Sequence, residues 1–136
     1  MDQSQPTDNA GKPQRLEGTK LANFTPTQTV PTLQITDTVE GTGDTVHEGA
    51  TVTVHYTGAL AGTGVIFQSS HDMGDPITFP LEGVIEGWTK GVPGMKIGGT
   101  RRLLIPAAQA YGERSPSPGI PPNSDLVFDI ELVAIR

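Results

Sequence analysis

The sequence predicts an α+β domain in which a mainly antiparallel sheet packs on one short helix. Three observations support this prediction. Apolar residues recur at every second position in several runs, which is typical of half-buried strands. Only one segment has helical character, and glycine and proline keep it short. The chain has 136 residues, a length that fits one domain and argues against two full ones.

The expected strands follow the alternation of apolar and polar residues along the chain. The clearest case is residues 51–57, where Val52, Val54 and Tyr56 alternate with threonine and histidine. Further strands are expected at residues 33–36, 77–80, 96–105 and 125–134, of which the second is a short edge strand. Several strands with a single brief helix point to a mainly antiparallel sheet.

The helix is expected at residues 84–89. Gly87 lies within this segment, and Gly91 and Pro93 follow it closely. Because glycine and proline disfavour helix, the segment cannot extend far.

The first 31 residues differ in composition from the rest and are expected to form a flexible polar arm or linker. They are rich in Gln, Thr, Pro, Asn and Asp, and they contain four of the 12 prolines. Their scattered apolar residues cannot bury enough surface to offset the ordering of the backbone. A docked stretch around residues 21–24, or an interaction motif, is the alternative. Residues 32–136 then form the folded domain.

Composition and charge exclude several classes of function. The chain has no cysteine, which rules out disulfides, thiolate metal sites and cysteine nucleophiles. Its apolar runs are too short for a membrane span or for the core of a signal peptide. The 15 acidic and 9 basic residues give a formal charge of -6, whereas a binder of the phosphate backbone would be basic. Nucleic acid is therefore not an expected partner.

The residue types used in nucleophilic or metal catalysis are present but are not arranged for it. Ser, Ser, His and Asp follow one another at residues 69–72, and four consecutive residues cannot align as a catalytic triad. A polar turn explains them better. The histidines His47, His55 and His71 lack the spacing of metal ligands. We therefore expect no metal site and no cofactor.

Aromatic residues are scarce, and six of them lie in the expected folded domain: Tyr56, Phe67, Phe79, Trp88, Tyr111 and Phe128. Core packing is the simplest explanation, because aromatic rings bury large areas. The alternative is a concave aromatic cup that binds a ligand, since buried tyrosine and tryptophan need partners for their polar atoms. Composition and spacing alone leave both explanations open.

Several motifs taken together resemble one known family. They are VTVHYTGAL, FQSS, GVIEGWTKGVPGMKIGGTRRLLIP, AYG and PPNSDLVFDIEL, and they follow in this order over about residues 33–136. On these motifs the chain is similar to the FKBP-type peptidyl-prolyl cis-trans isomerases. The resemblance implies a twisted antiparallel β-sheet of five to six strands wrapped around one short α-helix. It also implies that residues 32–136 form the isomerase domain, which we expect to be monomeric.

The resemblance further implies which residues form the site. The expected catalytic residues are Tyr56, Phe67, Gln68, Ile85, Trp88, Tyr111 and Phe128. The expected additional substrate-binding residues are Ile77, Phe79, Val84, Ala110 and Ile120. In the family, the tryptophan forms the floor of an aromatic cup. The backbone N–H at the position that matches Ile85 donates to a substrate carbonyl.

Gln68 departs from the family pattern, because most members carry an aspartate at this position. Met73 and Ile77 stand near positions where better-known members have an arginine and another aromatic residue, and the segment at residues 115–118 is also unusual. These changes make the expected cup more neutral and less aromatic. We therefore expect reduced catalytic efficiency and reduced macrolide affinity.

The implied function is isomerisation of X-Pro peptide bonds in protein substrates, in an apolar aromatic pocket without acid, base or metal chemistry. The expected partners are proline-containing peptides and unfolded or folding proteins, with a rapamycin-type macrolide as a further ligand. The alternative is a weakly catalytic or non-catalytic module that binds proline peptides and assists folding. The compartment stays open between the cytoplasm and an extracytoplasmic location, where the polar arm would follow a removed signal or anchor.

Overall fold

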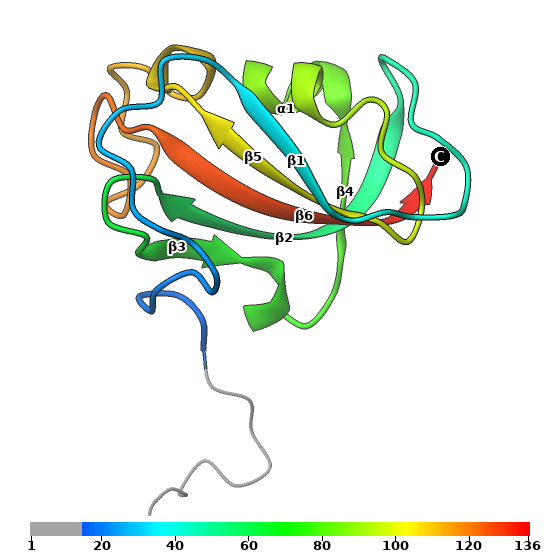
Figure 1. Cartoon of the computed structure of the whole chain (residues 1–136), viewed down its shortest axis with the longest axis horizontal. Coiled ribbons are helices and arrows are strands. Elements are labelled where there is room, and N and C mark those ends of the chain that lie inside the picture. Colours follow the sequence, from blue (N-terminus) through cyan, green and yellow to red (C-terminus); the bar gives the residue numbers. More distant parts are fainter. Residues whose placement is uncertain (1–14) are drawn as a thin grey trace, which may run out of the picture.

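The computed structural model describes residues 15–136, and within them six strands form one sheet (Figure 1). The strands are β1 (Gln34–Val39), β2 (Thr51–Leu60), β3 (Ile66–Ser69), β4 (Ile77–Pro80), β5 (Thr100–Ile105) and β6 (Leu126–Ile135). The one α-helix of this part is α1 (Glu86–Gly91), and the short 3-10 turns are η3 (Ser70–Asp72), η4 (Leu81–Gly83) and η5 (Ala107–Gln109).

All strand pairs in the sheet are antiparallel, and the order across it is β1, β5, β6, β2, β3. The long strand β2 has two partners on its other edge, because its first half pairs with β4 and its second half with β3. Figure 1 shows the pronounced twist of this sheet. The predicted α+β architecture is confirmed, and the strand number is the upper of the two predicted values.

The strand predicted to begin at residue 96 begins instead at Thr100. A turn precedes it, in which the Gly99 N–H donates to the Lys96 carbonyl at 2.9 Å. Gly98 within this turn has a φ of 93°, a left-handed conformation that favours glycine. The alternation of side chains alone could not show this turn.

The helix predicted at residues 84–89 is shifted by two residues and forms Glu86–Gly91. Ile85 is still extended, with a ψ of 152°, and its carbonyl accepts from the Trp88 N–H at 2.9 Å. In the part of the chain that the structure describes, no helix is long and apolar enough to cross a membrane.

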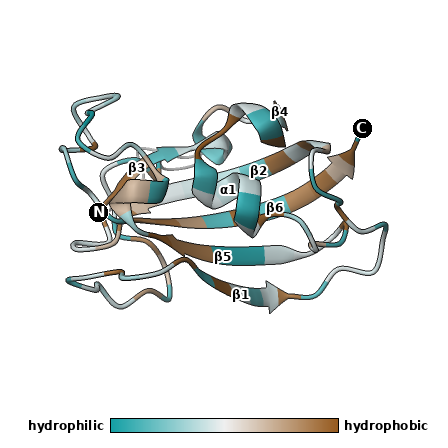
Figure 2. Ribbon diagram, turned by 90° about the horizontal axis from the view of Figure 1, so that it is seen from above, coloured by the Kyte–Doolittle hydropathy of each residue, from teal (hydrophilic) through white to brown (hydrophobic). Residues whose placement is uncertain are grey.

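The inner face of the sheet carries α1 and the main core, and Figure 2 shows the helix lying over the strands. The helix approaches β5 closely: a Cβ added to Gly87 would lie 2.6 Å from the Ile105 side chain. A Cβ added to Gly91 would lie 2.8 Å from Leu103, so glycine allows this close packing at both positions. The fully buried residues of the main core include Val52, Val54, Leu81, Leu103, Ile105, Leu126 and Ile130.

The outer face of the same sheet carries a smaller apolar cluster. Side chains alternate along β6, so Val127 points away from the main core to which its neighbours Leu126 and Phe128 belong. The outer cluster, as we call it, consists of Leu16, Leu21, Phe24, Ala59, Ile66, Leu104 and Val127. Part of this cluster therefore comes from the N-terminal residues.

Residues 15–31, which we expected in a flexible arm, contact the domain along their length. The Gly18 N–H donates to the Ile66 carbonyl, and the Ile66 N–H donates to the Thr19 carbonyl, each at 2.8 Å. The expectation of a flexible arm is therefore corrected for residues 15–31, whereas residues 1–14 lie outside the described part. Composition could not show that the backbone of this segment finds partners on the outer edge of β3.

Arg102 fastens the middle of this segment to the sheet. Its guanidinium donates to the carbonyls of Ala22 at 2.9 Å and Asn23 at 2.6 Å. It also lies 5.5 Å from the centre of the Phe24 ring, within the range of a cation–π contact. The carboxylate of Asp129, on the neighbouring strand β6, accepts from the Arg102 guanidinium at 2.7 Å.

Asp125 fastens the end of the segment. Its carboxylate accepts from the Val30 N–H and from the Ala107 N–H, each at 2.9 Å. Val30 is itself buried. One side chain thus holds both the N-terminal segment and the turn η5, which leads into the loop at residues 111–120.

Candidate active site

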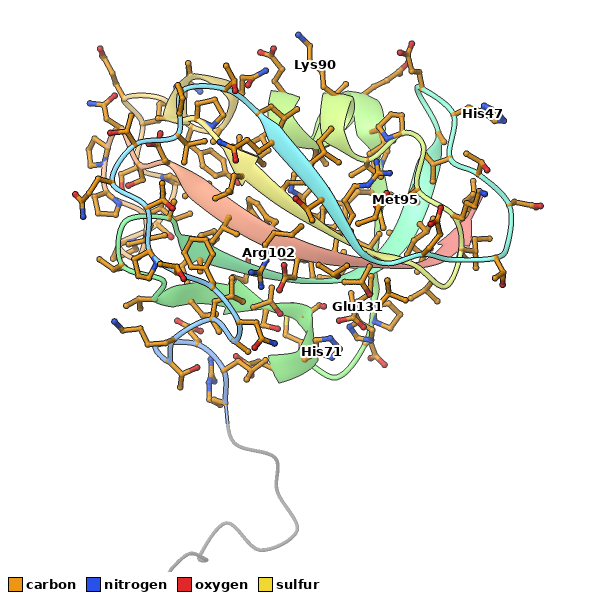
Figure 3. The ribbon with its side chains drawn as sticks, in the orientation of Figure 1. His47, His71, Lys90, Met95, Arg102 and Glu131 are labelled. Atoms are coloured by element: carbon orange, nitrogen blue, oxygen red, sulfur yellow. The ribbon has the colours of Figure 1, made fainter. Side chains whose placement is uncertain are left out.

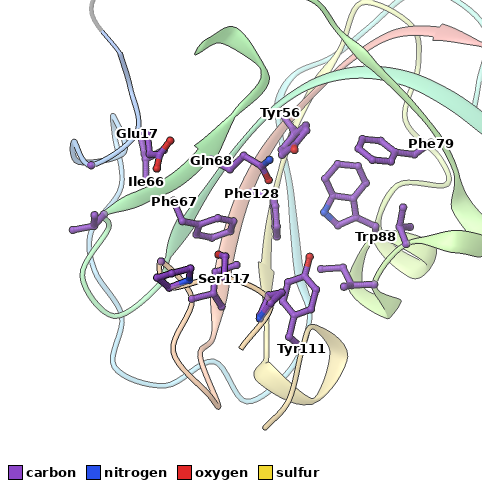
Figure 4. Close-up of a pocket in the computed structure, with 18 of the residues that line it drawn as sticks. Glu17, Tyr56, Ile66, Phe67, Gln68, Phe79, Trp88, Tyr111, Ser117 and Phe128 are labelled. Atoms are coloured by element: carbon purple, nitrogen blue, oxygen red, sulfur yellow. The ribbon is translucent and has the colours of Figure 1, made fainter. Parts of the chain in front are cut away.

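A cavity of about 1000 Å³ opens between the sheet, the start of α1 and the loop at residues 111–120 (Figure 4). Its lining contains all the aromatic residues of the expected cup: Tyr56, Phe67, Phe79, Trp88, Tyr111 and Phe128. A cavity of this size is at the upper end of the range of small-molecule sites, about 300–1,000 Å³. The sequence left core packing and a ligand-binding cup open as roles for these rings. Several rings have both roles, because Tyr56 and Phe128 line the cavity and also belong to the main core.

Trp88 lies at the centre of the aromatic lining. Its ring centroid is 5.4 Å from that of Phe79, 5.4 Å from that of Phe128 and 5.5 Å from that of Tyr56. The planes meet at 79°, 90° and 82°, so the indole makes edge-to-face contacts on three sides. Phe67 adds one more ring, 5.8 Å from Phe128. These contacts hold the rings in fixed positions around the cavity.

Gly58, near the end of β2, allows two of these rings to lie where they do. A Cβ added here would lie 2.7 Å from Phe67 Cζ and 2.7 Å from Phe128 Cε2. Contacts this short do not occur, so any larger residue would displace both rings. Gly58 was not among the predicted site residues, although it belongs to the HYTG motif.

Two N–H groups of the site have no partner within the described residues. The Trp88 indole nitrogen is buried and makes no hydrogen bond there. The backbone N–H of Ile85 likewise donates no hydrogen bond among residues 15–136. The two donors differ in access: Ile85 is only partly buried, so the carbonyl oxygen of a bound ligand could reach its N–H, whereas the indole nitrogen of Trp88 is closed off from solvent.

Apart from Glu17, the described residues that line the cavity have no charged side chain. Burial raises the pKa of Tyr56, and the nearby Tyr111 raises it further, so the Tyr56 hydroxyl stays protonated and can donate. Gln68 lines the cavity with an exposed, uncharged amide. Within residues 15–136, no group of three or more His, Asp or Glu side chains could hold a metal ion.

The structure brings together all but two of the predicted site residues. Those that line the cavity are Tyr56, Phe67, Gln68, Phe79, Val84, Ile85, Trp88, Tyr111, Ile120 and Phe128. Ile77 and Ala110 do not line it; both are partly buried and pack against the main core. Ile77 is two residues from Phe79 along β4 and Ala110 precedes Tyr111, so each is near the site without facing it.

Other lining residues were not predicted. They are Glu17, Gly18, Val65, Ile66, Gly83, Pro116, Ser117, Pro118 and Gly119. The loop residues could have been found, because the segment at residues 115–118 was recognised as unusual. Glu17 and Gly18 carried no signal, since the segment that contains them was expected to be an arm.

The Ser-Ser-His-Asp segment forms the turn η3 and takes no part in the cavity. Ser70 Oγ is buried, accepts from the Tyr56 N–H at 2.8 Å and lies 2.9 Å from His55 Nδ1. His71 stacks on His55 at 4.1 Å and contacts Glu131 at 2.8 Å (Figure 3). These side chains fasten η3 to the sheet, so the polar turn is confirmed and a triad is not formed.

Comparison with known proteins identifies the family. Residues 43–133 match the model of the FKBP-type peptidyl-prolyl cis-trans isomerases, and these residues contain every aromatic ring of the cavity. The chain belongs to this family. Its members isomerise X-Pro peptide bonds, so the protein is a peptidyl-prolyl isomerase that binds proline-containing peptides.

Individual members of the family are similar over most of this domain. The chain is 51% identical over 90 residues to the peptidyl-prolyl cis-trans isomerase FPR2 of Saccharomyces cerevisiae. This match covers 65% of this chain and 67% of that protein. It is 46% identical over 106 residues to the FK506-binding protein of Streptomyces anulatus, covering 76% and 86%. It is also 46% identical to FkpA of Escherichia coli over 71% of this chain, but only 35% of FkpA is matched.

Solved structures of family members have the same fold. The crystal structure of FkpA from Escherichia coli superimposes with a TM-score of 0.69 at 41% identity, covering 81% of this chain and 53% of that one. AtFKBP13 superimposes with a TM-score of 0.69 at 38% identity, covering 76% and 93%. The predicted family and its implied fold are thus confirmed.

Proposed function

We propose that the aromatic cavity is the catalytic site of this isomerase and that Trp88, Tyr56 and Phe128 contact the prolyl ring of the substrate. One observation carries the proposal: the cavity combines an apolar aromatic lining with the backbone N–H of Ile85, which has no hydrogen-bond partner among residues 15–136. An X-Pro segment has the matching features, because its ring is apolar and its backbone offers carbonyl acceptors but no N–H at proline.

The reaction needs no proton transfer. Trans is favoured over cis by only about 0.5–1 kcal/mol at X-Pro bonds, and the uncatalysed exchange takes roughly 10–100 s. An increase from about 0.01 per second to about 1000 per second needs about 7 kcal/mol of transition-state stabilisation. Only the amide rotates, so no bond to hydrogen is formed or broken.

An apolar cavity favours the twisted amide over the planar one. Twisting removes the resonance of the amide and lowers its polarity, so a dry site disfavours the planar ground state more than the transition state. The rings around Trp88 would hold the prolyl ring while the preceding carbonyl turns. An N–H donor fixed at Ile85 would anchor the peptide, and a preorganised donor of this kind contributes roughly 3 kcal/mol.

Gln68 sets the expected strength of catalysis. A carboxylate at this place would orient its neighbours through charge, whereas the amide of Gln68 can only exchange neutral hydrogen bonds. We therefore propose measurable but reduced activity. Replacing Gln68 with Asp should raise kcat/KM, and no change in either kcat/KM or macrolide affinity would contradict this role for the side chain.

A macrolide of the rapamycin type is proposed as a second ligand of the same cavity. The Streptomyces anulatus relative is named an FK506-binding protein, and six aromatic rings line the cavity of this chain. With a neutral Gln68 the affinity should be lower than that of a Gln68→Asp variant. Competition between the macrolide and a proline peptide, followed by calorimetry, would test both points.

A protease-free isomerisation assay on a short proline peptide tests the catalytic proposal. We expect a rate above background that changes little between about pH 5.5 and pH 8.5, because no residue acts as acid or base. A rate equal to background would refute catalysis, and tight peptide binding without turnover would favour the binding module instead.

The proposal also includes the binding of unfolded proteins by the domain as a monomer. Light scattering during the refolding of a proline-rich substrate tests this binding.

A further inference from the structure

One side of the cavity is built by residues that precede the part of the chain matched by the family. Glu17 and Gly18 line the cavity next to Val65 and Ile66, and Figure 4 shows Glu17 beside Ile66 with Gln68 nearby. We call residues 15–21 the N-terminal wall. The wall lies against β3, so it extends the cavity beyond the aromatic cup on the side of Phe67.

The N-terminal wall is fixed to the domain from two directions. Its backbone pairs with β3 through Gly18, as described above, and Leu21 is buried in the outer cluster. On the other side, the carboxylate of Asp72 accepts from the Leu16 N–H at 2.7 Å and from the Glu17 N–H at 3.0 Å. Glu17 is thus presented at the rim of the cavity by a backbone that is held on both sides of it.

The cavity is larger than a prolyl ring needs. A volume of about 1000 Å³ admits several residues of an extended peptide, so the residues that flank the proline also lie against the lining. The aromatic rings surround Trp88, whereas the wall is farther along β3. A residue beside the proline, rather than the proline itself, would therefore contact Glu17.

Glu17 is the one carboxylate among the described residues that line the cavity. Its partner is Arg15, whose Nη2 lies 2.8 Å from Glu17 Oε1. Both side chains are more than half exposed, at 72% and 52%, and exposed pairs of this kind are weak. A cationic side chain of a substrate can replace Arg15 at little cost. The formal charge of -6 on the chain also attracts basic peptides.

We propose that Glu17 selects substrates that carry lysine or arginine beside the proline. This inference rests on the proposed function of the cavity, since it assigns a flanking subsite to the same site. It makes Glu17 a specificity-determining residue for a reaction in which it takes no chemical part. With Gln68 neutral, the charge preference of the site comes from Glu17 at its rim instead of from the cup.

The test uses one peptide series and two readouts. In the series, the residue before the proline, and separately the residue after it, is lysine, leucine or glutamate. Affinity is measured by the fluorescence of Trp88, which is the only tryptophan of the chain and lies in the cavity, so the signal does not depend on turnover. The second readout is kcat/KM in the protease-free assay.

At one of the two positions, we expect lysine to bind about three-fold tighter than leucine and glutamate about three-fold weaker, as for an exposed ion pair. The Glu17→Gln variant should lose most of this difference, and only the weaker attraction by the net charge of the chain should remain. The difference should also shrink when the ionic strength is raised, because exposed charges are screened.

Glu40→Gln is the matched control, since it removes the same charge from an exposed residue that does not line the cavity. Lysine preference should persist in Glu40→Gln. Equal loss in both variants would assign the preference to the net charge of the chain and overturn the role of Glu17. Equal affinity for the three peptides in the unmodified protein would overturn it as well.

The two readouts separate this inference from the proposed function. Turnover of all peptides without a charge preference would refute the inference and leave the isomerase site intact. Charge-selective binding that is lost in Glu17→Gln, but with no turnover of any peptide, would support the inference and refute catalysis. Failure of every peptide to bind would refute both.

Discussion

The two faces of the sheet are covered in different ways. On the inner face, α1 and the aromatic rings pack on β2, β5 and β6 around a core of fully buried side chains such as Leu103 and Ile105. On the outer face, residues 15–31 are held by backbone hydrogen bonds and by the side chains of Asp125 and Arg102. Among the side chains that this segment contributes to the outer cluster, Leu21 is the most buried. Changes on the inner face should therefore unfold the domain. Changes on the outer face should release a segment from a domain that stays folded.

The largest effect is expected for Leu103→Ala. Leu103 is fully buried between β5 and α1, and removal of a buried leucine side chain costs about 2–5 kcal/mol. Leu104 is its neighbour in β5, but it packs against the outer cluster and is only partly buried. Leu104→Ala should cost about 1 kcal/mol. Urea unfolding of both variants measures the difference, and equal losses would refute the contrast between the faces.

A large loss of activity is expected for Gly58→Ala. The new Cβ would meet both Phe67 and Phe128, so the rings must move, and overpacking of this kind costs about 1–3 kcal/mol. Because both rings line the cavity, kcat/KM should fall by at least about ten-fold, which corresponds to about 1.4 kcal/mol. Gly62→Ala is the control, since a Cβ at Gly62 meets nothing within 4 Å. Full activity in Gly58→Ala would show that the positions of these rings are not critical.

A smaller effect on global stability is expected for Leu21→Ala. Because Leu21 lies on the outer face, residues 15–31 can detach while the sheet stays folded. The free energy of global unfolding should therefore change by less than about 1 kcal/mol. The amides of Gly18 and Leu21, which donate to β3 and to its preceding loop, should exchange with solvent at least about ten-fold faster. A loss of global stability as large as that of Leu103→Ala would show that both faces unfold as one unit.

The smallest effect is expected when acid weakens the contact between Asp72 and the N-terminal segment. The N–H of Leu16, and secondarily that of Glu17, lowers the pKa of Asp72 below its ordinary value of 3.8. A lowered pKa means that the ionised carboxylate favours docking above 3.8 and that this contribution disappears as the pH falls through the folded value. As the pH falls below 3.8, the amides of Leu16 and Glu17 should progressively lose protection from exchange. The Asp72→Asn variant should show little pH dependence of this protection; an identical pH response in both proteins would assign the change to another group.

The inner face could be predicted from the sequence because its contacts are made by side chains in regular patterns. Period-two alternation placed Tyr56 and Phe128 on one face of their strands, and the motifs supplied the remaining rings. The same reasoning was less accurate for Ile77 and Ala110, which neighbour true lining residues. A motif specifies which residues lie near the site, but the orientation of each side chain depends on local backbone geometry.

The outer face could not be predicted because its contacts leave no periodic pattern. Residues 15–31 contribute scattered apolar side chains, and the partners of their backbone groups lie far away in the sequence, at Ile66, Asp72 and Asp125. An argument from composition favours a flexible arm for such a segment, because it considers the apolar content and not the hydrogen-bond partners of the backbone. Glu17 was missed for the same reason.

The pairing of the N-terminal segment with β3 also affects the solubility of the protein. A strand at the edge of a sheet offers unpaired N–H and C=O groups to other chains and is a site of aggregation. Here the Gly18 N–H and the Thr19 carbonyl occupy both backbone groups of Ile66. A chain shortened to begin at residue 25 would expose this edge, and the apolar Ile66 beside it, to solvent. The segment therefore protects the folded domain from edge-to-edge association, independently of what the cavity binds.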